Sequence, residues 1–180
     1  MGNVLEHEFK QLLDFKIENI NAHLDNVDDE TLISLLKQER GQIFTDAIQR
    51  NDLNDFETLL ISGYADNIAI PLNEELRNSR QKRSEGYMHY EFLLNKALYK
   101  TEPKNDDTVY VMYEYDDRQK LMNWYEKRIE CSVQFPNFLS SSLEKWEKNY
   151  ICFLKIKTLN EGSVGKYIAP LTNKCEEKEV

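Results

Sequence analysis

The hydrophobic period of the sequence changes near Pro103, and this change constrains the fold most. Before Pro103, apolar residues recur at intervals of three or four, the period of a helix, over residues 4–24, 32–48, 55–61 and 87–99. After it, residues 108–115 read TVYVMYEY, a run of β-branched and aromatic side chains typical of a strand. Helices followed by strands, rather than alternating with them, indicate an α+β domain.

Cap and breaker residues divide the helical half. Asp28 or Asp29 is placed to cap the helix over residues 32–48. Gly41 lies inside that helix and is expected to bend or split it, since glycine costs about 1 kcal/mol there relative to alanine.

The next segments are punctuated by turn residues. Residues 51–54 are expected to form a turn, and Ser62-Gly63 to break or end the helix that follows it. Pro71 is tolerated only near the start of a helix, which predicts a short helix over residues 71–78 and a polar loop over residues 79–86.

The second half is expected to hold most of the strands. A helix is predicted from Asp116 to about residue 129, followed by strands at residues 132–139, 150–158, 165–168 and 176–180. We therefore expect a helical extension over residues 1–55 and one α+β domain over residues 56–180.

A group of hydroxyl side chains follows one of the predicted strands. Ser140, Ser141 and Ser142 come directly after Phe138 and Leu139, so we expect them at the strand's end. Taken alone, such serines are more often a solvated loop or a helix cap than a functional site.

Two carboxylates stand close together near the last residue of the sequence. Glu177 and Glu179 are two residues apart, and if residues 175–180 are extended, both lie on one face about 7 Å apart along the strand. Taken alone, this acidic stretch reads as a charged tail.

In their order and spacing, these segments resemble the second half of the mono-ADP-ribosyltransferase toxins and their eukaryotic ecto-enzyme relatives. The chain has FLSSS at residues 138–142, GKYIAP at residues 165–170 and EKEV at residues 177–180. Upstream, residues 64–77, 94–98 and 109–110 resemble the family's helices and first core strand. The resemblance covers residues 64–180 and implies N-terminal helices followed by an ADP-ribosyltransferase-like mixed β core.

The resemblance implies NAD as the substrate that supplies ADP-ribose, and it implies roles for the polar residues. Glu179 would stabilise the positive charge that develops on the ribose, and Glu177 would orient or deprotonate an arginine acceptor on a protein. Ser140 would hold Glu179 by a hydrogen bond. Ser141 and Ser142 would support the cofactor and the neighbouring backbone.

The first strand departs from the family pattern. The family carries Val-Tyr-Arg there, with the arginine held against the phosphates of NAD, but Val111 occupies the arginine position in this chain. Arg77, Arg80 and Arg118 are candidates to replace that arginine.

The C-terminal region carries two further expectations from the resemblance. The loop over residues 170–176 would meet the target protein. Because the family's strand continues beyond Glu-x-Glu-Val, the domain is expected to lack its last strand or strands.

Composition restricts the partners. A net charge of −9 opposes a non-specific hold on nucleic acid, and no apolar run reaches the length of a membrane span. The cysteine count of 3 does not suggest a disulfide scaffold. We expect a cytoplasmic protein, or one delivered to a host cytosol if it is an effector.

Three functions remain open on the sequence alone. The first is a mono-ADP-ribosyltransferase of the toxin or effector kind. The second is a catalytically silent relative that acts as an interaction module. The third is an NAD glycohydrolase, in which water replaces the protein acceptor.

Overall fold

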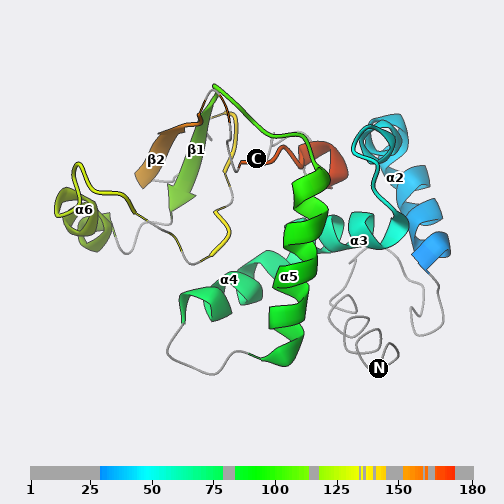
Figure 1. The fold of residues 1–180 in the computed structure, drawn as a ribbon, viewed down its shortest axis with the longest axis horizontal. Coiled ribbons are helices and arrows are strands. Elements are labelled where there is room, and N and C mark those ends of the chain that lie inside the picture. The colour runs from blue at the N-terminus through cyan, green and yellow to red at the C-terminus, as the bar shows by residue number, and fades with distance from the viewer. Residues whose placement is uncertain are drawn as a thin grey trace.

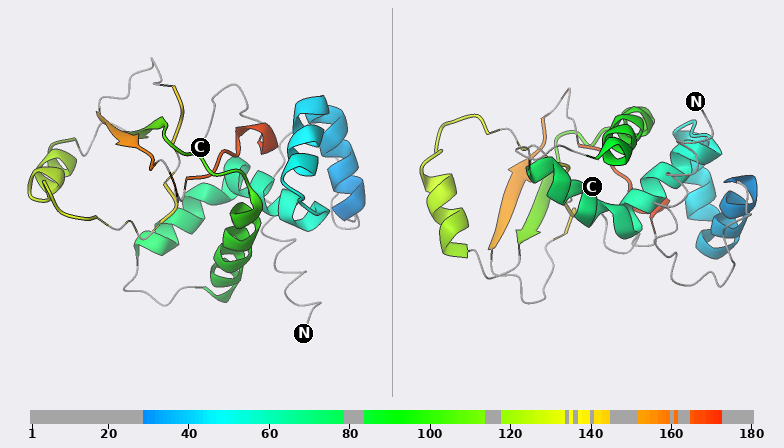
Figure 2. Two further views of the ribbon diagram at one scale, coloured as in Figure 1. Left: turned by 45° about the horizontal axis from the view of Figure 1, so that its top comes forward. Right: turned by 90° about the horizontal axis from the view of Figure 1, so that it is seen from below.

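Most of the described helices form one group, and the sheet lies beside that group. The computed structural model describes residues 29–78, 84–113, 118–133, 135, 137–139, 141–144, 152–159, 161 and 165–172. Figure 1 shows strands β1 and β2 beside the group of helices formed by α2 (Asp29–Arg50), α3 (Asp55–Gly63), α4 (Ala69–Arg77) and α5 (Glu85–Lys100). Figures 1 and 2 place α6 (Arg118–Glu126) on the side of the sheet remote from those helices. The predicted α+β class is confirmed.

Helix α2 is bent where the sequence predicts it. Gly41 has φ of 73° and ψ of −154°, a left-handed conformation that is costly for residues with a side chain. The hydroxyl of Thr45 donates a hydrogen bond to the Gly41 carbonyl at 3.2 Å, which gives one freed backbone group a partner. The glycine therefore divides α2 into two helical pieces of different direction.

A turn and a capping box join α2 to α3. The predicted turn over residues 51–54 is confirmed, with the Leu53 N–H bonded to the Ile48 carbonyl at 3.1 Å. Asn54 Oδ1 accepts the Glu57 N–H at 2.8 Å, and Glu57 Oε2 accepts the Asn54 N–H at 3.0 Å. This reciprocal pair satisfies two backbone donors and fixes the start of α3.

Helix α3 ends at Gly63, as one of the two alternatives for Ser62-Gly63 predicts, but the backbone does not break there. Gly63 has helical φ and ψ of −64° and −37°, and α3 passes directly into the π-helical turn η2 (Tyr64–Ile68) and then α4. Glycine permits a break without requiring one, and Ser62, 3% exposed, donates to the Leu171 carbonyl at 2.8 Å. Tertiary contact thus holds this segment helical. The wide turn η2 comes just before the first turn of α4, where Pro71 can lack an N–H.

Helix α5 spans the predicted helix over residues 87–99 and starts slightly earlier. Ser84 Oγ accepts the Tyr87 N–H at 3.3 Å, so the cap falls inside the predicted polar loop. On the inner face, the Tyr90 hydroxyl donates to the Leu60 carbonyl at 2.5 Å, and this side chain has no exposed surface. Helix α5 is therefore fixed against α3 by a buried hydrogen bond as well as by packing.

One hydrophobic core joins the helices to a segment near the last residues of the chain. Its C-terminal members are Ile168 and Leu171, at and beside the short 3-10 helix η4 (Ala169–Leu171). Its members from α2 are Leu32, Ile33, Leu36, Phe44, Ala47 and Ile48. The domain boundary at residue 55 stays a prediction, while α2, on the N-terminal side of that boundary, packs into this shared core.

The sheet pairs β1 (Thr108–Tyr113) with β2 (Cys152–Lys157) in antiparallel register. Both strands fall within the predicted strands at residues 108–115 and 150–158, and α6 falls within the predicted helix after Asp116. These three predictions are confirmed.

Two other predicted strands are wrong in the part of the chain that the structure describes. None of the described residues within 132–139 lies in a strand, and Phe138 instead packs its ring on Tyr64, with centroids 5.4 Å apart. Within residues 165–168, Lys166 forms a single bridge with Pro103. Apolar side chains in these segments fill the helical core, which sequence alternation alone does not distinguish from strand pairing. The predicted helix at 4–24 and strand at 176–180 lie outside the described residues.

Candidate active site

The serine motif meets the sheet beside β1. The Tyr110 N–H donates to the Ser142 carbonyl at 2.8 Å, and the Ser142 N–H donates to the Tyr110 carbonyl at 2.9 Å. Because Tyr110 directs both backbone groups to Ser142, the neighbouring residues of β1 face β2 with theirs. Strand β1 therefore has a partner on each edge, and one of these partners is the last serine of the motif.

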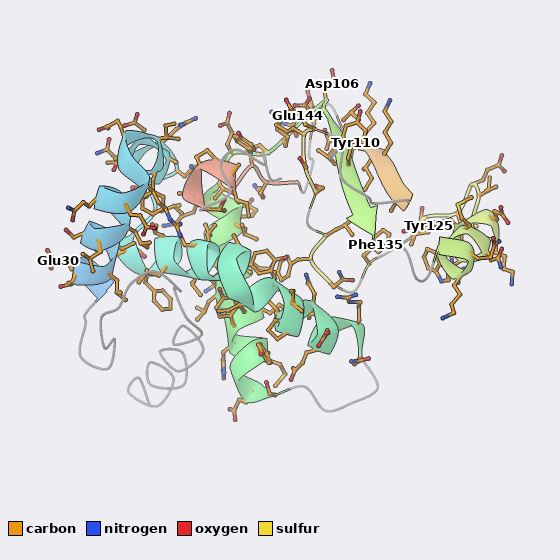
Figure 3. All side chains as sticks on the ribbon, turned by 180° about the vertical axis from the view of Figure 1, so that it is seen from behind. Glu30, Asp106, Tyr110, Tyr125, Phe135 and Glu144 are labelled. Carbon is orange, nitrogen blue, oxygen red and sulfur yellow. The ribbon has the colours of Figure 1, made fainter. Side chains whose placement is uncertain are left out.

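The side chain of Ser142 is turned inward. It is 2% exposed, and its Oγ accepts the Glu144 N–H at 3.2 Å, so it ties down the chain just after the motif. Ser141 is half-buried, while Ser140 lies outside the described residues. Figure 3 shows Tyr110 and Glu144 near the same end of the sheet as Asp106. The roles assigned to the three serines stay predictions.

The register assigns residues to the two faces of the sheet. Directly paired residues project to the same face, so Ser142, Tyr110 and Lys155 share one face in that order across the sheet. Their Cα atoms span about 10 Å from Ser142 to Lys155. Val111 projects to the other face with its partner Leu154 and is 3% exposed.

The last described residues lie at and just after η4 and precede the predicted glutamates in the sequence. The Leu171 N–H bonds to the Ile168 carbonyl at 2.8 Å, and the Thr172 hydroxyl bonds to the Ala169 carbonyl at 3.0 Å. Ala169, Leu171 and Thr172 are 0–2% exposed, so these three side chains are buried. Glu177 and Glu179 follow and lie outside the described residues.

Two ionisable groups in the helical half have shifted pKa values. Burial raises the pKa of Glu57, but the Lys100 ammonium at 2.8 Å and the Asn54 N–H outweigh it and hold that pKa below its usual value. Burial, with the charges of Glu75 and Glu74, raises the pKa of Tyr87. Both shifts arise from helix packing and capping rather than from the motif serines.

The described residues contain neither a cluster of metal-binding side chains nor a membrane-spanning helix. No group of three or more His, Cys, Asp or Glu side chains among them is arranged to hold a metal ion. None of the helices formed by these residues has the length and apolarity needed to span a bilayer.

Comparison with known proteins gives matches in structure. No protein-family model matches the chain, and no curated protein matches it significantly. Plx2a, an ADP-ribosyltransferase toxin from Paenibacillus larvae, gives a TM-score of 0.58 at 20% identity over 85% of this chain and 81% of Plx2a. An ADP-ribosyltransferase from Clostridium botulinum gives 0.59 at 14% identity over 79% of this chain and 80% of the other. This chain has the ADP-ribosyltransferase fold.

A eukaryotic protein has the same fold. The mono-ADP-ribosyltransferase ART2.2 gives a TM-score of 0.52 at 19% identity over 99% of this chain and 75% of ART2.2. A mutant of ART2.2 in complex with NAD gives 0.54 at the same identity. The ADP-ribosyltransferase-like core expected from the resemblance is confirmed.

The strand register places one cationic side chain on the face of the sheet that carries Ser142. Lys155 lies on that face, is exposed, and forms no hydrogen bond or ion pair with any residue the structure describes. Lys157, one step along the same face, is paired with Asp106 at 3.3 Å. Of the arginines considered from the sequence, Arg77 lies on α4 and donates to the Asn73 carbonyl at 3.0 Å. Arg80 and the side chain of Arg118 are outside the described part.

Sequence reasoning missed Lys155, although a signal was present. The strand reads CFLKIK, in which Leu154 and Ile156 alternate with Lys155 and Lys157. Such alternation predicts one apolar and one charged face. It does not say which neighbouring strand shares the charged face, because that depends on pairing register.

Proposed function

We propose that this protein is a mono-ADP-ribosyltransferase that transfers ADP-ribose from NAD to an arginine side chain of a protein. The single observation that carries the proposal is the pairing of Ser142 with Tyr110 on β1, within a fold like that of Plx2a and the Clostridium botulinum ADP-ribosyltransferase. NAD is supported as the substrate by its presence in the ART2.2 complex. A toxin or effector role, with action in a host cytosol, belongs to the same proposal.

The proposed chemistry breaks the bond between nicotinamide and ribose. Nicotinamide leaves with the bonding electron pair, and positive charge develops on the ribose as in glycoside hydrolysis. Glu179 stabilises that charge, and Ser140 holds Glu179 in place by a hydrogen bond. An arginine nitrogen of the acceptor then bonds to the ribose carbon, and its proton passes to Glu177.

The proposal gives the described residues supporting roles. Ser142 fixes the motif to β1 through its backbone, and Ser141 faces the cofactor side of the motif. Lys155 contacts a phosphate of NAD from the face opposite to that of Val111, so it binds the phosphate at a different place from the family's arginine. This last assignment is supported by its shared face with Ser142 and by its exposed charge.

The test is release of nicotinamide from NAD by the purified protein. Glu179→Ala is expected to lower the rate by on the order of 10²–10³-fold, as removal of one preorganised electrostatic group does. Glu176→Ala is the matched control: in the extended strand that the sequence predicts, residue 176 would project to the face opposite Glu179, so its removal should change the rate little. Equal loss in both variants would remove the catalytic assignment of Glu179.

A second measurement separates transfer from hydrolysis. With an arginine-containing protein as acceptor and NAD labelled in its ADP-ribose part, the wild type should label the acceptor. Glu177→Ala should lose labelling while retaining nicotinamide release. Release without labelling of arginine, lysine or other side chains would identify an NAD glycohydrolase instead. No release from folded protein would identify a silent interaction module.

A further inference from the structure

Arg40 connects three segments that are far apart in the sequence. Its Nη1 donates to the Leu171 carbonyl at 2.9 Å and to the Ser62 hydroxyl oxygen at 3.2 Å. Ser62 Oγ in turn donates to the same carbonyl at 2.8 Å. One backbone oxygen of η4 therefore receives hydrogen bonds from both α2 and α3. Figures 1 and 2 show η4 lying against α2 in different views.

The surroundings hold this guanidinium in one orientation. The guanidinium carbon lies 5.3 Å from the centroid of the Phe44 ring, and Phe44 is 1% exposed. Arg40 is also the last residue before the kink at Gly41, so the bend sets the direction in which its side chain leaves the helix. The Leu171 carbonyl sits among residues buried almost completely, where an unpaired acceptor would be costly.

The bonded carbonyl belongs to the last residue of η4. Thr172 follows it, buried, and Glu177 comes five residues after Thr172 in the sequence. A helix as short as η4 cannot satisfy its own final carbonyls, so its conformation depends on donors from elsewhere. Arg40 and Ser62 supply those donors and thereby fix the point from which the glutamate segment starts.

We propose that Arg40 is a positioning residue for catalysis, which acts through η4 on the segment that carries Glu177 and Glu179. The inference rests on the proposed function. It assigns a part in the active site to α2, a helix that the sequence places in an accessory extension. Small displacements of a catalytic group lower rates strongly, so an anchor of η4 can control turnover without touching NAD.

The experiment compares Arg40→Met, Arg40→Lys and the control Arg50→Met. Arg50 lies on the same helix, but its guanidinium is exposed and 3.9 Å from Glu102. Arg40→Met should lower kcat for nicotinamide release by on the order of 10- to 100-fold, with the KM for NAD nearly unchanged. Arg40→Lys, which keeps the charge and one donor, should restore part of kcat. Arg50→Met should match the wild type.

Hydrogen exchange supplies a readout that does not depend on NAD. In Arg40→Met, the Leu171 and Thr172 amides should exchange faster, while the Leu94 amide in α5 stays protected. Unchanged kcat in an active wild-type background, or a fall in kcat with uniform loss of protection across α5, would overturn the positioning role alone. A wild type that releases no nicotinamide would overturn the proposed function and this role with it, whatever the exchange pattern.

Discussion

Removal of α2 is expected to destroy the fold rather than trim an accessory segment. Five large apolar side chains of α2 are 1–7% exposed in the shared core: Leu32, Ile33, Leu36, Phe44 and Ile48. Burial of each contributes about 1.5–3 kcal/mol, so their loss removes about 8–15 kcal/mol. That equals the net stability of a typical domain, about 5–15 kcal/mol. A chain that starts at Asp52 should therefore be unfolded or insoluble.

Urea unfolding followed by circular dichroism tests this reasoning, with point variants to calibrate it. Phe44→Ala should lower the free energy of unfolding by about 3–5 kcal/mol. Ile43→Ala, at the neighbouring position but 63% exposed, should change it by less than about 0.5 kcal/mol. A soluble chain from Asp52 onward that unfolds cooperatively near the full-length midpoint would refute the shared core. It would support instead an independent domain over residues 56–180.

Three further predictions concern charged groups. Lys155→Ala should raise the KM for NAD by roughly 10- to 100-fold, because it removes a charge-assisted hydrogen bond. Lys157→Ala is the control and should raise the KM far less, because Lys157 is already paired with Asp106. Equal effects of the two variants would contradict the phosphate role of Lys155. Because the pKa of Glu57 is lowered on folding, its contribution to stability is present above the usual value of 4.5 and is lost as pH falls through the lowered one. Lys100→Met should therefore reduce the acid-induced drop of the urea midpoint, and an unchanged drop would count against the ion pair. Burial and the charges of Glu75 and Glu74 raise the pKa of Tyr87 above its usual 10.0. The stability that the neutral Tyr87 hydroxyl provides is therefore present below pH 10.0 and is lost as the pH rises through the raised pKa. In ultraviolet difference titration against Tyr87→Phe, Glu75→Gln should move this ionisation to lower pH, and no movement would exclude the charge effect.

Local signals predict the positions of the described helices. The apolar period over residues 32–48 and 87–99 corresponds to α2 and α5, because the buried face of an amphipathic helix is visible as a period of apolar residues in its own sequence. The bend at Gly41 was also predictable, since only the residue type decides whether φ of 73° is tolerated.

The conformations of two segments depend on contacts with distant residues, which the local sequence does not reveal. Helix α3 ends at Gly63 as predicted, but the backbone stays helical into η2, and the Ser62 side chain bonds to the carbonyl of Leu171, 109 residues later. Phe138 is used in the helical core against Tyr64 rather than in a strand. Neither partner can be identified from the local pattern, which fixes only the preference of each segment.

The candidate site was predictable in part for the same reason. The order of the motifs pointed to the ADP-ribosyltransferase fold and to Ser142, which lies beside β1. Lys155 could be identified only from the pairing of Tyr110 with β2 on one side and with Ser142 on the other, and Arg40 only from a contact with a residue 131 positions later. The roles of Glu177, Glu179 and Ser140 stay predictions.

The placement of Ile168 and Leu171 in the helical core has a consequence for the chain during its synthesis. Helices α2 to α5 are complete by Lys100, but the core they share is filled only when η4 arrives. Until then, the nascent helices expose the apolar surface that these two residues cover. We expect such a chain to interact with chaperones at the ribosome and to acquire cooperative stability only when η4 closes its contact with α2.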